Sequence, residues 1–345
     1  MKKFFKTTFR ILNWLAIVAL LLSYLAPFIS PKYFWPISFF GLTFKAILIG
    51  FCAILFFGFV FKTRMTLINI AILLVGLPFI QRTYSINTDV SSEVKTRFMS
   101  FNVYGFGVNR NINTSKSINH YLETHSIDLA VFQEWRYGSG RISKELFPHQ
   151  LGFPFINSKR VGLYLVSKYP IVNSGIIPFT NVPSSVGGFA DILINNTTVR
   201  IYAIHLETTR VKSEDYHVLK KLEFDSVSTY KAKNLAQRLK YSMQKRAQQV
   251  DDIKNHMKDC PYPSIIMGDL NDTPQSYAYQ QLLEGKNDAF VEAGHGFEAT
   301  YLKPFPILRI DFILADKSID CLNYGSTDSI YSDHKLIFAD LLINK

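Results

Sequence analysis

Side chains that can bind a metal ion or transfer a proton stand at the ends of six apolar runs between residues 98 and 342. Each residue alone has an ordinary structural explanation, such as a solvated strand end or a turn. As a set they comprise four carboxylates, two amides and two imidazoles, and no run ends on a cysteine or a serine nucleophile motif. The residues are Asn102, Glu134, His205, Asp269, Asn271, Asp311, Asp333 and His334.

If these strand ends meet in the folded protein, the carboxylates require a cation, because like charges held close together resist ionisation. Oxygen-rich ligands favour a hard ion such as Mg²⁺ or Mn²⁺ over zinc. Histidines beside carboxylates can transfer protons and carry positive charge. This combination suits displacement at phosphorus, where catalysis is mostly positioning and charge stabilisation.

The elements that would position these residues are mainly strands. Asn-Asn-Thr-Thr between two apolar runs predicts a hairpin turn, and helical patterns cover residues 115–125 and 215–257. We therefore expect an α+β sandwich with mainly antiparallel pairing rather than regular βαβ alternation. The predicted strands, chosen by length and by β-branched and aromatic content, are 98–103, 129–133, 162–167, 190–194, 199–206, 264–267, 309–314 and 336–342.

Residues 1–80 have a different composition, with no Asp or Glu and eight Lys or Arg. Three apolar runs, Ile11–Ile29, Leu42–Phe61 and Met65–Ile80, approach the ~20 residues that cross a bilayer and predict three transmembrane helices. A cleaved signal peptide is the alternative for the first run. The polar residues 81–95 are predicted to be a linker, and residues 96–345 a single catalytic domain.

Positive charge near the N-terminus, and Lys62 and Arg64 between the second and third apolar runs, predict that the N-terminus and this loop lie in the cytoplasm. The expected location is therefore the cytoplasmic membrane, as a multi-pass protein with its N-terminus inside and its C-terminal domain outside. Residues 81–345 hold 38 − 8 = 30 basic and 27 acidic residues, so this part is close to neutral, which weakens a general nucleic-acid-binding interpretation. The basic segment Lys212–Arg246 is either a solvated helical face or a surface for anionic headgroups or a polyanionic substrate.

The ordered motifs resemble those of the endonuclease/exonuclease/phosphatase family from Thr96 to Lys345. They are Asn102, Gln133–Glu134, His205, GDLN at 268–271, RID at 309–311 and SDH at 332–334. The resemblance implies a four-layered α/β sandwich, two packed sheets flanked by helices, with the site at one end. The SFNVYGFG motif departs from the pattern of abasic-site endonucleases, so a role in DNA repair is not expected.

Residue by residue, the resemblance also implies roles. Glu134 would be the principal Mg²⁺ ligand, with Asn102 and Asp333 as further ligands and Mn²⁺ as an alternative ion. Asp269 would orient or activate the attacking water, and Asn271 would hold a phosphate oxygen. His205 and His334 would be the proton-transfer or phosphate-contacting groups, with Asp311 or Asp333 fixing the His334 tautomer; which histidine is acid and which is base stays open. Asp272 has no counterpart and is predicted to cap a helix that begins near Thr273–Pro274.

The expected function is a membrane-anchored Mg²⁺-dependent phosphoesterase that acts outside the cytoplasmic membrane on a lipid or headgroup phosphoester. An extracytoplasmic nuclease acting on DNA or RNA is the alternative. A non-catalytic, membrane-bound binding or scaffold module is the alternative of another class. The expected partners are the phosphoester substrate and the lipid bilayer, with no obligate protein partner.

Overall fold

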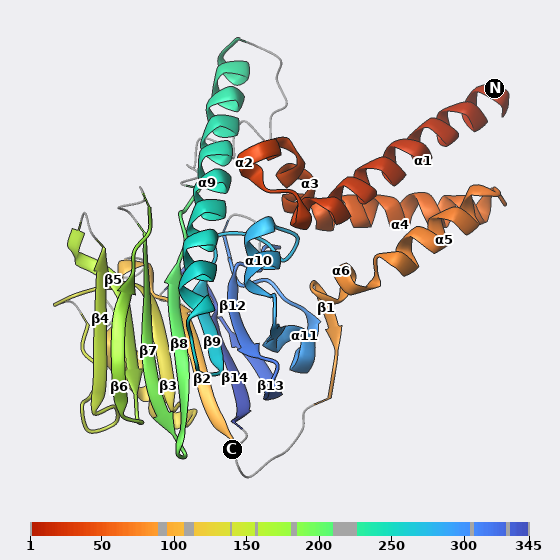
Figure 1. Cartoon of the computed structure of the whole chain (residues 1–345). Helices are drawn as coiled ribbons and strands as arrows, with labels where there is room; N and C mark the ends of the chain where they lie inside the picture. Colours follow the sequence, from red (N-terminus) through yellow and green to blue (C-terminus); the bar gives the residue numbers. More distant parts are fainter. Residues whose placement is uncertain are drawn as a thin grey trace.

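The computed structural model describes residues 2–88, 95–106, 114–138, 140–155, 158–180, 185–209, 226–303, 307–328 and 332–343. Two six-stranded sheets pack face to face (Figure 1). In the first sheet the strand order is β10 (Lys286–Asp288), β12 (Asp311–Asp316), β9 (Ser264–Asp269), β8 (Thr197–His205), β7 (Val186–Ile194) and β6 (Ile171–Ile177). In the second it is β13 (Ile319–Thr327), β14 (Leu336–Ile343), β2 (Thr96–Asn102), β3 (Leu129–Arg136), β5 (Ser158–Ser167) and β4 (His149–Phe155).

Each sheet is mixed. β2 and β3 are parallel in one sheet and β8 and β9 in the other, while the remaining neighbours are antiparallel. The predicted hairpin between β7 and β8 is confirmed, and both turn residues, Asn195 and Asn196, have positive φ (49° and 69°), as a two-residue hairpin turn requires. All eight predicted strands are confirmed, although their ends differ by a few residues.

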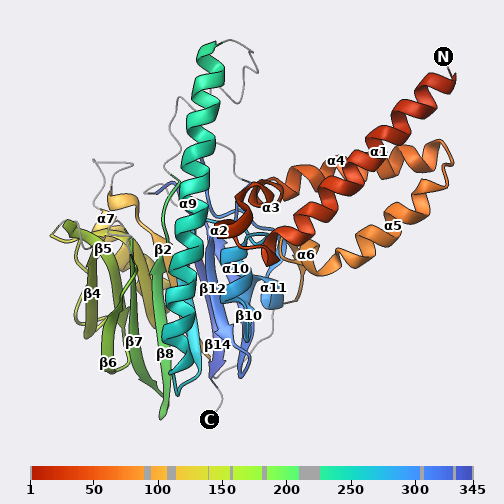
Figure 2. The same ribbon diagram turned by 45° about the horizontal axis from the view of Figure 1, so that its top comes forward.

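Helices cover both outer faces of the sheet pair, which confirms the predicted α+β sandwich with four layers. α9 (Ser226–Lys258) and α10 (Tyr277–Leu282) pack on the first sheet, and α7 (Thr114–Thr124) packs on the second (Figure 2). Alternating residues of β8 show why its stretch 201–204 is apolar on both faces. Ile201 and Ala203 face the core between the sheets, whereas Tyr202 and Ile204 face α9. The start of the predicted helix 215–257, and the basic residues 212–221, lie outside the described residues.

The prediction of three membrane-spanning helices is wrong, because the described helices are too short for three spans. One helix, Lys6–Phe28, is long and apolar enough to cross a membrane, and the bent pair Pro31–Leu42 and Phe44–Val60 could form a second span with a 54° bend. The apolar run Met65–Ile80 is not one helix, because Gly76 and Pro78 divide it into α5 (Met65–Val75) and α6 (Leu77–Gln81). An 11-residue helix such as α5 is only about 16 Å long and does not by itself cover the hydrocarbon layer.

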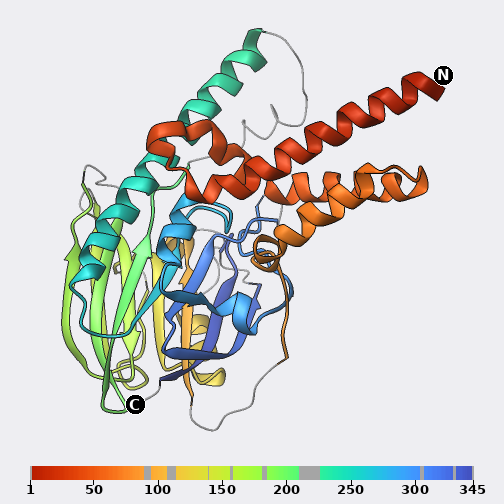
Figure 3. The same ribbon diagram turned by 45° about the vertical axis from the view of Figure 1, so that its right-hand side comes forward.

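The helices of the first 81 residues form what we call the N-terminal unit. α1 (Lys2–Leu25), α4 (Phe44–Val60) and α5 lie side by side and project from the sandwich (Figures 1 and 3). Asn13 of α1 and Asn69 of α5 are buried and hydrogen-bond to each other through their amides, at 2.8 and 3.4 Å. Between α1 and α4 the chain forms η1 (Ala26–Phe28), α2 (Pro31–Phe34), η2 (Trp35–Ile37) and α3 (Ser38–Leu42).

The stretch predicted as a linker contains the strand β1 (Tyr84–Ile86), which pairs with β11 (His295–Phe297). This strand follows α6 directly and lies beside α11 (Ala289–Ala293), where the Ser85 hydroxyl donates to the Val291 carbonyl at 3.0 Å. Residues 89–94 lie outside the described part. Cys52, Cys260 and Cys321 are all free.

Candidate active site

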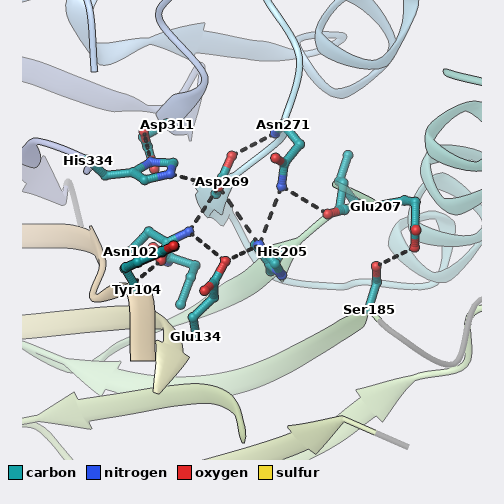
Figure 4. A network of polar contacts seen from close by, with 12 residues as sticks. Asn102, Tyr104, Glu134, Ser185, His205, Glu207, Asp269, Asn271, Asp311 and His334 are labelled. Carbon is teal, nitrogen blue, oxygen red and sulfur yellow. Dashed lines mark hydrogen bonds and ion pairs between the residues drawn. The ribbon is translucent and has the colours of Figure 1, made fainter. Parts of the chain in front are cut away.

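All eight candidate residues lie at one end of the sandwich (Figure 4 labels all of them except Asp333). The topology explains this convergence. β2 and β3 are parallel, as are β8 and β9, so each pair of strands ends at the same edge of its sheet. Antiparallel β12 begins where β9 ends, which places Asp311 opposite Asp269, and Asp269 is also opposite His205.

Glu134 stands at an irregularity in β3, where the register with β5 shifts between Phe132 and Trp135. Its φ of 53° is rare for a residue with a side chain, and such strained backbone is concentrated at functional sites. The bulge turns the carboxylate out of the sheet toward Asn102, whose amide nitrogen lies 3.4 Å from Glu134 Oε1 and 3.1 Å from Asp269 Oδ2. The Asn102 amide oxygen accepts a hydrogen bond from the Tyr104 backbone N–H.

Asp269 is buried at the centre of the cluster. The glycine before it, Gly268, is required, because its φ is 147° and a Cβ would lie 1.9 Å from the Ile204 carbonyl oxygen. Asn271 also has positive φ, 52°, and its backbone N–H donates to Asp269 Oδ1 at 2.7 Å. The Asn271 amide nitrogen lies 3.4 Å from His205 Nε2 and donates to the Leu206 carbonyl. Asp269 and Asn271 are therefore locked into one loop.

The two histidines approach Asp269 from opposite sides. His205 Nε2 lies 3.8 Å from Asp269 Oδ2 and 3.6 Å from Glu134 Oε1, and its Nδ1 has no hydrogen-bond partner among the described residues. His334 Nε2 also lies 3.8 Å from Asp269 Oδ2.

Asp311 is the carboxylate that orients His334. Its Oδ2 lies 3.0 Å from His334 Nδ1, whereas Asp333 Oδ1 is 4.0 Å from Nε2. Ser332 and Thr300 support this pair: the Ser332 hydroxyl accepts from the His334 N–H, and the Thr300 hydroxyl accepts from the Asp311 N–H. Sequence reasoning included Ser332 within a motif, but no motif pointed to Thr300.

Burial and the neighbouring carboxylate of Asp311 raise the pKa of Asp269 to about 6. Burial opposes the charge of His334, but the carboxylates of Asp311 and Asp269 outweigh it and raise the pKa of this histidine to about 10. Burial also raises the pKa of Asp333. Two acids with raised pKa values, Asp269 and Asp333, thus lie beside a histidine whose pKa is raised by its carboxylate neighbours.

The donor set fits a hard divalent cation. The site offers carboxylate oxygens, and the buried Oδ1 atoms of Asp311 and Asp333 have no hydrogen-bond partner among the described residues. Asp269, Asp311 and His334 each offer a ligand atom, and these atoms lie within 4.8 Å of one another. The predicted principal ligand, Glu134, lies on the open side of the cluster, with its side chain 31% exposed. The assignment of Glu134, Asn102 and Asp333 as ligands stays a prediction.

Asp272 does not cap a helix, contrary to the sequence prediction. α10 begins later, at Tyr277, and Ser276 is its N-cap. Asp272 instead forms a buried ion pair with Arg246 of α9 (Nε to Oδ2, 2.9 Å). Arg246 also donates to the Glu207 carbonyl at 3.0 Å. Arg246, which belongs to the predicted basic segment, therefore joins the chain after β8 to the chain after β9 and does not face solvent.

A cavity of about 410 Å³ opens on this cluster. Tyr104, Tyr301 and Lys303 line it beside the candidate residues, and the Tyr301 ring lies edge-on to the His334 imidazole, 5.1 Å away. No sequence motif singled out these three residues.

Comparison with known proteins defines the class. Residues 99–334 match the Endonuclease/Exonuclease/phosphatase family, so the chain belongs to this family, whose members are hydrolases that act on phosphoester bonds. The predicted family and enzyme class are confirmed. Residues 3–83 match a domain of unknown function (DUF8431). No curated protein matches the chain.

Solved structures share the fold. An endonuclease/exonuclease/phosphatase from Bacteroides vulgatus is 17% identical with a TM-score of 0.54, covering 72% of this chain and 99% of its own. A family protein from Bacteroides thetaiotaomicron is 15% identical with a TM-score of 0.53, covering 74% and 100%. D. rerio TDP2, in complex with a single-strand DNA product, is 16% identical with a TM-score of 0.52, covering 72% and 99%.

Proposed function

We propose that this protein is a membrane-anchored, Mg²⁺-dependent phosphoesterase whose substrate is a lipid or headgroup phosphoester outside the cytoplasmic membrane. One observation carries the choice of substrate. The N-terminal unit docks on the end of the sandwich that holds the site, against the loop that follows Asn271. Thr273 Oγ1 lies 3.4 Å from the Gly41 carbonyl, and Gln275 Nε2 donates to the Phe79 carbonyl at 2.8 Å. Arg82, the residue directly after the unit, donates to the Pro274 carbonyl at 3.2 Å.

The site residues would hold the ion and perform hydrolysis. Glu134 would hold the metal with the neighbouring polar groups, and a bound Mg²⁺ would supply positive charge that neutralises charge developing on the phosphoryl oxygens. Asp269 orients the attacking water and takes its proton as the water oxygen bonds to phosphorus. The bond from phosphorus to the leaving oxygen breaks, and a histidine donates a proton to that oxygen. Asn271 binds a phosphoryl oxygen through its amide nitrogen.

Either histidine can be the general acid, because both Nε2 atoms lie 3.8 Å from the same Asp269 oxygen. Leaving-group dependence separates them. Removing the general acid slows esters with an alkoxide leaving group much more than p-nitrophenyl esters, whose leaving group needs no proton. His205→Ala and His334→Ala, each measured on both kinds of ester, identify the acid.

The anchoring proposal rests on exposed apolar surface and charge. Along α1 and α4 large apolar side chains such as Leu15, Val18 and Phe56 are exposed, as on helices that face lipid. The start of α1 and the α4–α5 turn, with Lys62 and Arg64, lie together at the end remote from the sandwich (Figure 3), where Phe9 and Phe61 are in ring contact. With α1 crossing and the α4–α5 hairpin packed along it, this end lies in the cytoplasm and the catalytic domain outside.

Cysteine labelling tests this orientation. In a cysteine-free background, a membrane-impermeant maleimide applied to intact cells should label Lys258→Cys and leave Lys62→Cys unlabelled until the cells are permeabilised. The reverse pattern would overturn the proposed orientation.

A nuclease is the second candidate. Lys231, Lys233 and Lys240 of α9 are exposed, and this basic face could contact a nucleic-acid backbone. TDP2, which shares the fold, is in complex with a single-strand DNA product.

A Mg²⁺-supplemented panel decides between the candidates. The full chain is assayed on DNA, RNA, phospholipid, sphingolipid and inositol phosphates, with Asp269→Asn as the control. Hydrolysis of a lipid or headgroup ester that Asp269→Asn abolishes supports the proposal. Hydrolysis of nucleic acid alone replaces it with the nuclease. Activity unchanged in Asp269→Asn overturns the site assignment, and no hydrolysis of any substrate favours a binding module.

A further inference from the structure

The cavity that opens on the catalytic residues continues to an apolar end that the sandwich does not build. Two segments far apart in the sequence supply this end, which we call the apolar channel. One is the junction of α3 and α4, and the other is the half of α9 that extends beyond the sheets (Figures 1 and 3). The side chains concerned are Leu42, Phe44 and Ala46, and Leu235, Leu239 and Met243.

The α9 side of the channel follows from helical periodicity. Leu235, Leu239 and Met243 stand four residues apart and therefore share one helix face. Farther along the helix, Val250 and Ile253 pack on the first sheet. In the extending half no strand of the described residues covers the corresponding face, so these side chains line the cavity instead.

The N-terminal side of the channel is fixed in place rather than loosely apposed. Gly41 packs so tightly that a Cβ there would lie 2.3 Å from the Gln275 carbonyl oxygen. Lys45 donates to the Glu298 carbonyl at 3.0 Å and lies over the Phe297 ring. Lys32 of α2 forms an ion pair with Asp251 of α9. The N-terminal unit is thus joined to both sides of the cavity.

We infer that the apolar channel holds a hydrocarbon chain of the substrate while its phosphoester lies at Asp269, so that the N-terminal unit is a substrate-binding element as well as an anchor. This inference rests on the proposed function and narrows it to a phosphoester that carries an apolar tail. The residues that set specificity for the tail are Ala46, Leu235 and Leu239.

Three features select this occupant. The channel is continuous with the phosphoester site, so one molecule spans both. Ala46 is exposed at the start of α4, where the surface leads to exposed apolar residues such as Ile49, so a chain can pass between the bilayer and the channel. The volume, about 410 Å³, lies within the range of small-molecule sites. A nucleic-acid backbone would instead place charged phosphates against an apolar wall, which is unfavourable.

Two alanines of α4 make a matched test. Ala46 and Ala53 are two helical turns apart and so lie on nearly the same face, but only Ala46 lines the cavity. The wild-type chain, Ala46→Trp and Ala53→Trp are placed in nanodiscs of a phosphate-free galactolipid. The substrates are p-nitrophenyl alkyl phosphates with alkyl chains from methyl to octyl, and hydrolysis releases p-nitrophenol and the alkyl phosphate. Binding of octyl phosphate in the presence of Mg²⁺ is measured separately by calorimetry.

For the wild type, kcat/KM should rise roughly fourfold with each methylene that enters the channel. The Ala46→Trp side chain fills the channel, so the octyl-to-methyl ratio of kcat/KM should fall at least tenfold and octyl phosphate binding should weaken, while Ala53→Trp should behave as wild type. Hydrolysis of every ester with no dependence on chain length, or equal behaviour of the two tryptophan variants, overturns the channel and leaves the phosphoesterase intact. Tail-dependent binding that Ala46→Trp abolishes, without hydrolysis of any ester, supports the channel and overturns the proposed function.

Discussion

The two ends of the active-site cavity are built in opposite ways. At the polar end each important side chain leaves a strand, and its neighbours in the sequence form a short, recognisable motif such as GDLN or SDH. At the apolar end leucines, a methionine and an alanine come from helices about 200 residues apart, and no motif marks them. Chemistry constrains residue type, whereas binding of a hydrocarbon chain constrains only size and apolarity. The first can therefore be found from sequence and the second only from packing.

The largest effect is expected from the centre of the polar end. Asp269→Asn removes the group that we propose takes the proton from water, so kcat should fall by roughly 10²- to 10⁴-fold, measured on p-nitrophenyl methyl phosphate with Mg²⁺. Asp316→Asn, at the far end of β12, is the matched control and should retain wild-type kcat. An equal loss in both variants would mean that the effect is structural.

The same substitution should change the pH dependence of stability. The pKa of Asp269 is raised from 3.8 in the unfolded chain to about 6 in the folded one. The contribution of this group is therefore fully present below pH 3.8 and is lost as the pH rises through 6. In EDTA, thermal unfolding of the wild type should lose stability across this window, and Asp269→Asn should lose less. A steeper loss in the variant would contradict the assignment of a raised pKa.

The next largest effect is expected on the stabilisation of the protein by Mg²⁺, which tests metal binding at the polar end separately from catalysis. If Glu134 is the principal ligand, adding Mg²⁺ at 100 times its Kd stabilises the wild-type chain by about 2.7 kcal/mol. Glu134→Gln keeps the shape of the side chain and removes its charge, so its melting temperature should respond little to Mg²⁺. The exposed Glu145→Gln is the control and should respond as wild type does. A full Mg²⁺ response in Glu134→Gln would move the site to the Asp269, Asp311 and His334 group.

The sandwich could be predicted from the sequence because its central strands are buried on both faces, as Ile201 and Tyr202 show. Such strands appear in the sequence as short apolar runs. Strands β4, β6 and β13 were missed because Gly152, Pro154, Gly175 and Gly325 interrupt their patterns. Strands β1, β10 and β11 were missed because each has only three residues. The eight candidate site residues were chosen from strand ends and motif order, and the fold brings them to one end of the sandwich, but their roles stay a prediction.

The remaining errors concern features set by distant contacts. Asp272 resembles a helix cap locally, but its partner is Arg246, 26 residues away. The apolar run Met65–Ile80 has nearly the length of a span, but Gly76 and Pro78 divide it. The docking of the N-terminal unit depends on surface fit between regions more than 190 residues apart, and no local pattern encodes such a fit.

A moderate effect is expected where the two ends of the cavity are joined. Gly41→Ala places a methyl group against the Gln275 carbonyl and should cost about 1–3 kcal/mol of stability through overpacking. It should also lower the octyl-to-methyl preference, because the wall of the channel shifts. Gly50→Ala in α4 is the control, since a Cβ there meets nothing within 4 Å. If Gly41→Ala lowers stability but keeps the chain-length preference, docking of the N-terminal unit does not shape the channel.

The smallest effect should come from within the N-terminal unit, away from the cavity. Asn13 and Asn69 form a buried amide pair between α1 and α5, and such interhelical bonds in membranes contribute about 0.6 kcal/mol. A double-mutant cycle with Asn13→Leu and Asn69→Leu, read by denaturation in nanodiscs, should return a coupling of that size. The octyl-to-methyl ratio should not change in any of the three variants, because the channel is set by Gly41 and its contacts with the catalytic domain and not by the packing of α1 on α5. A change in that ratio would mean that the arrangement of α1, α4 and α5 reaches the active site, and the two ends of the cavity would then form one coupled unit.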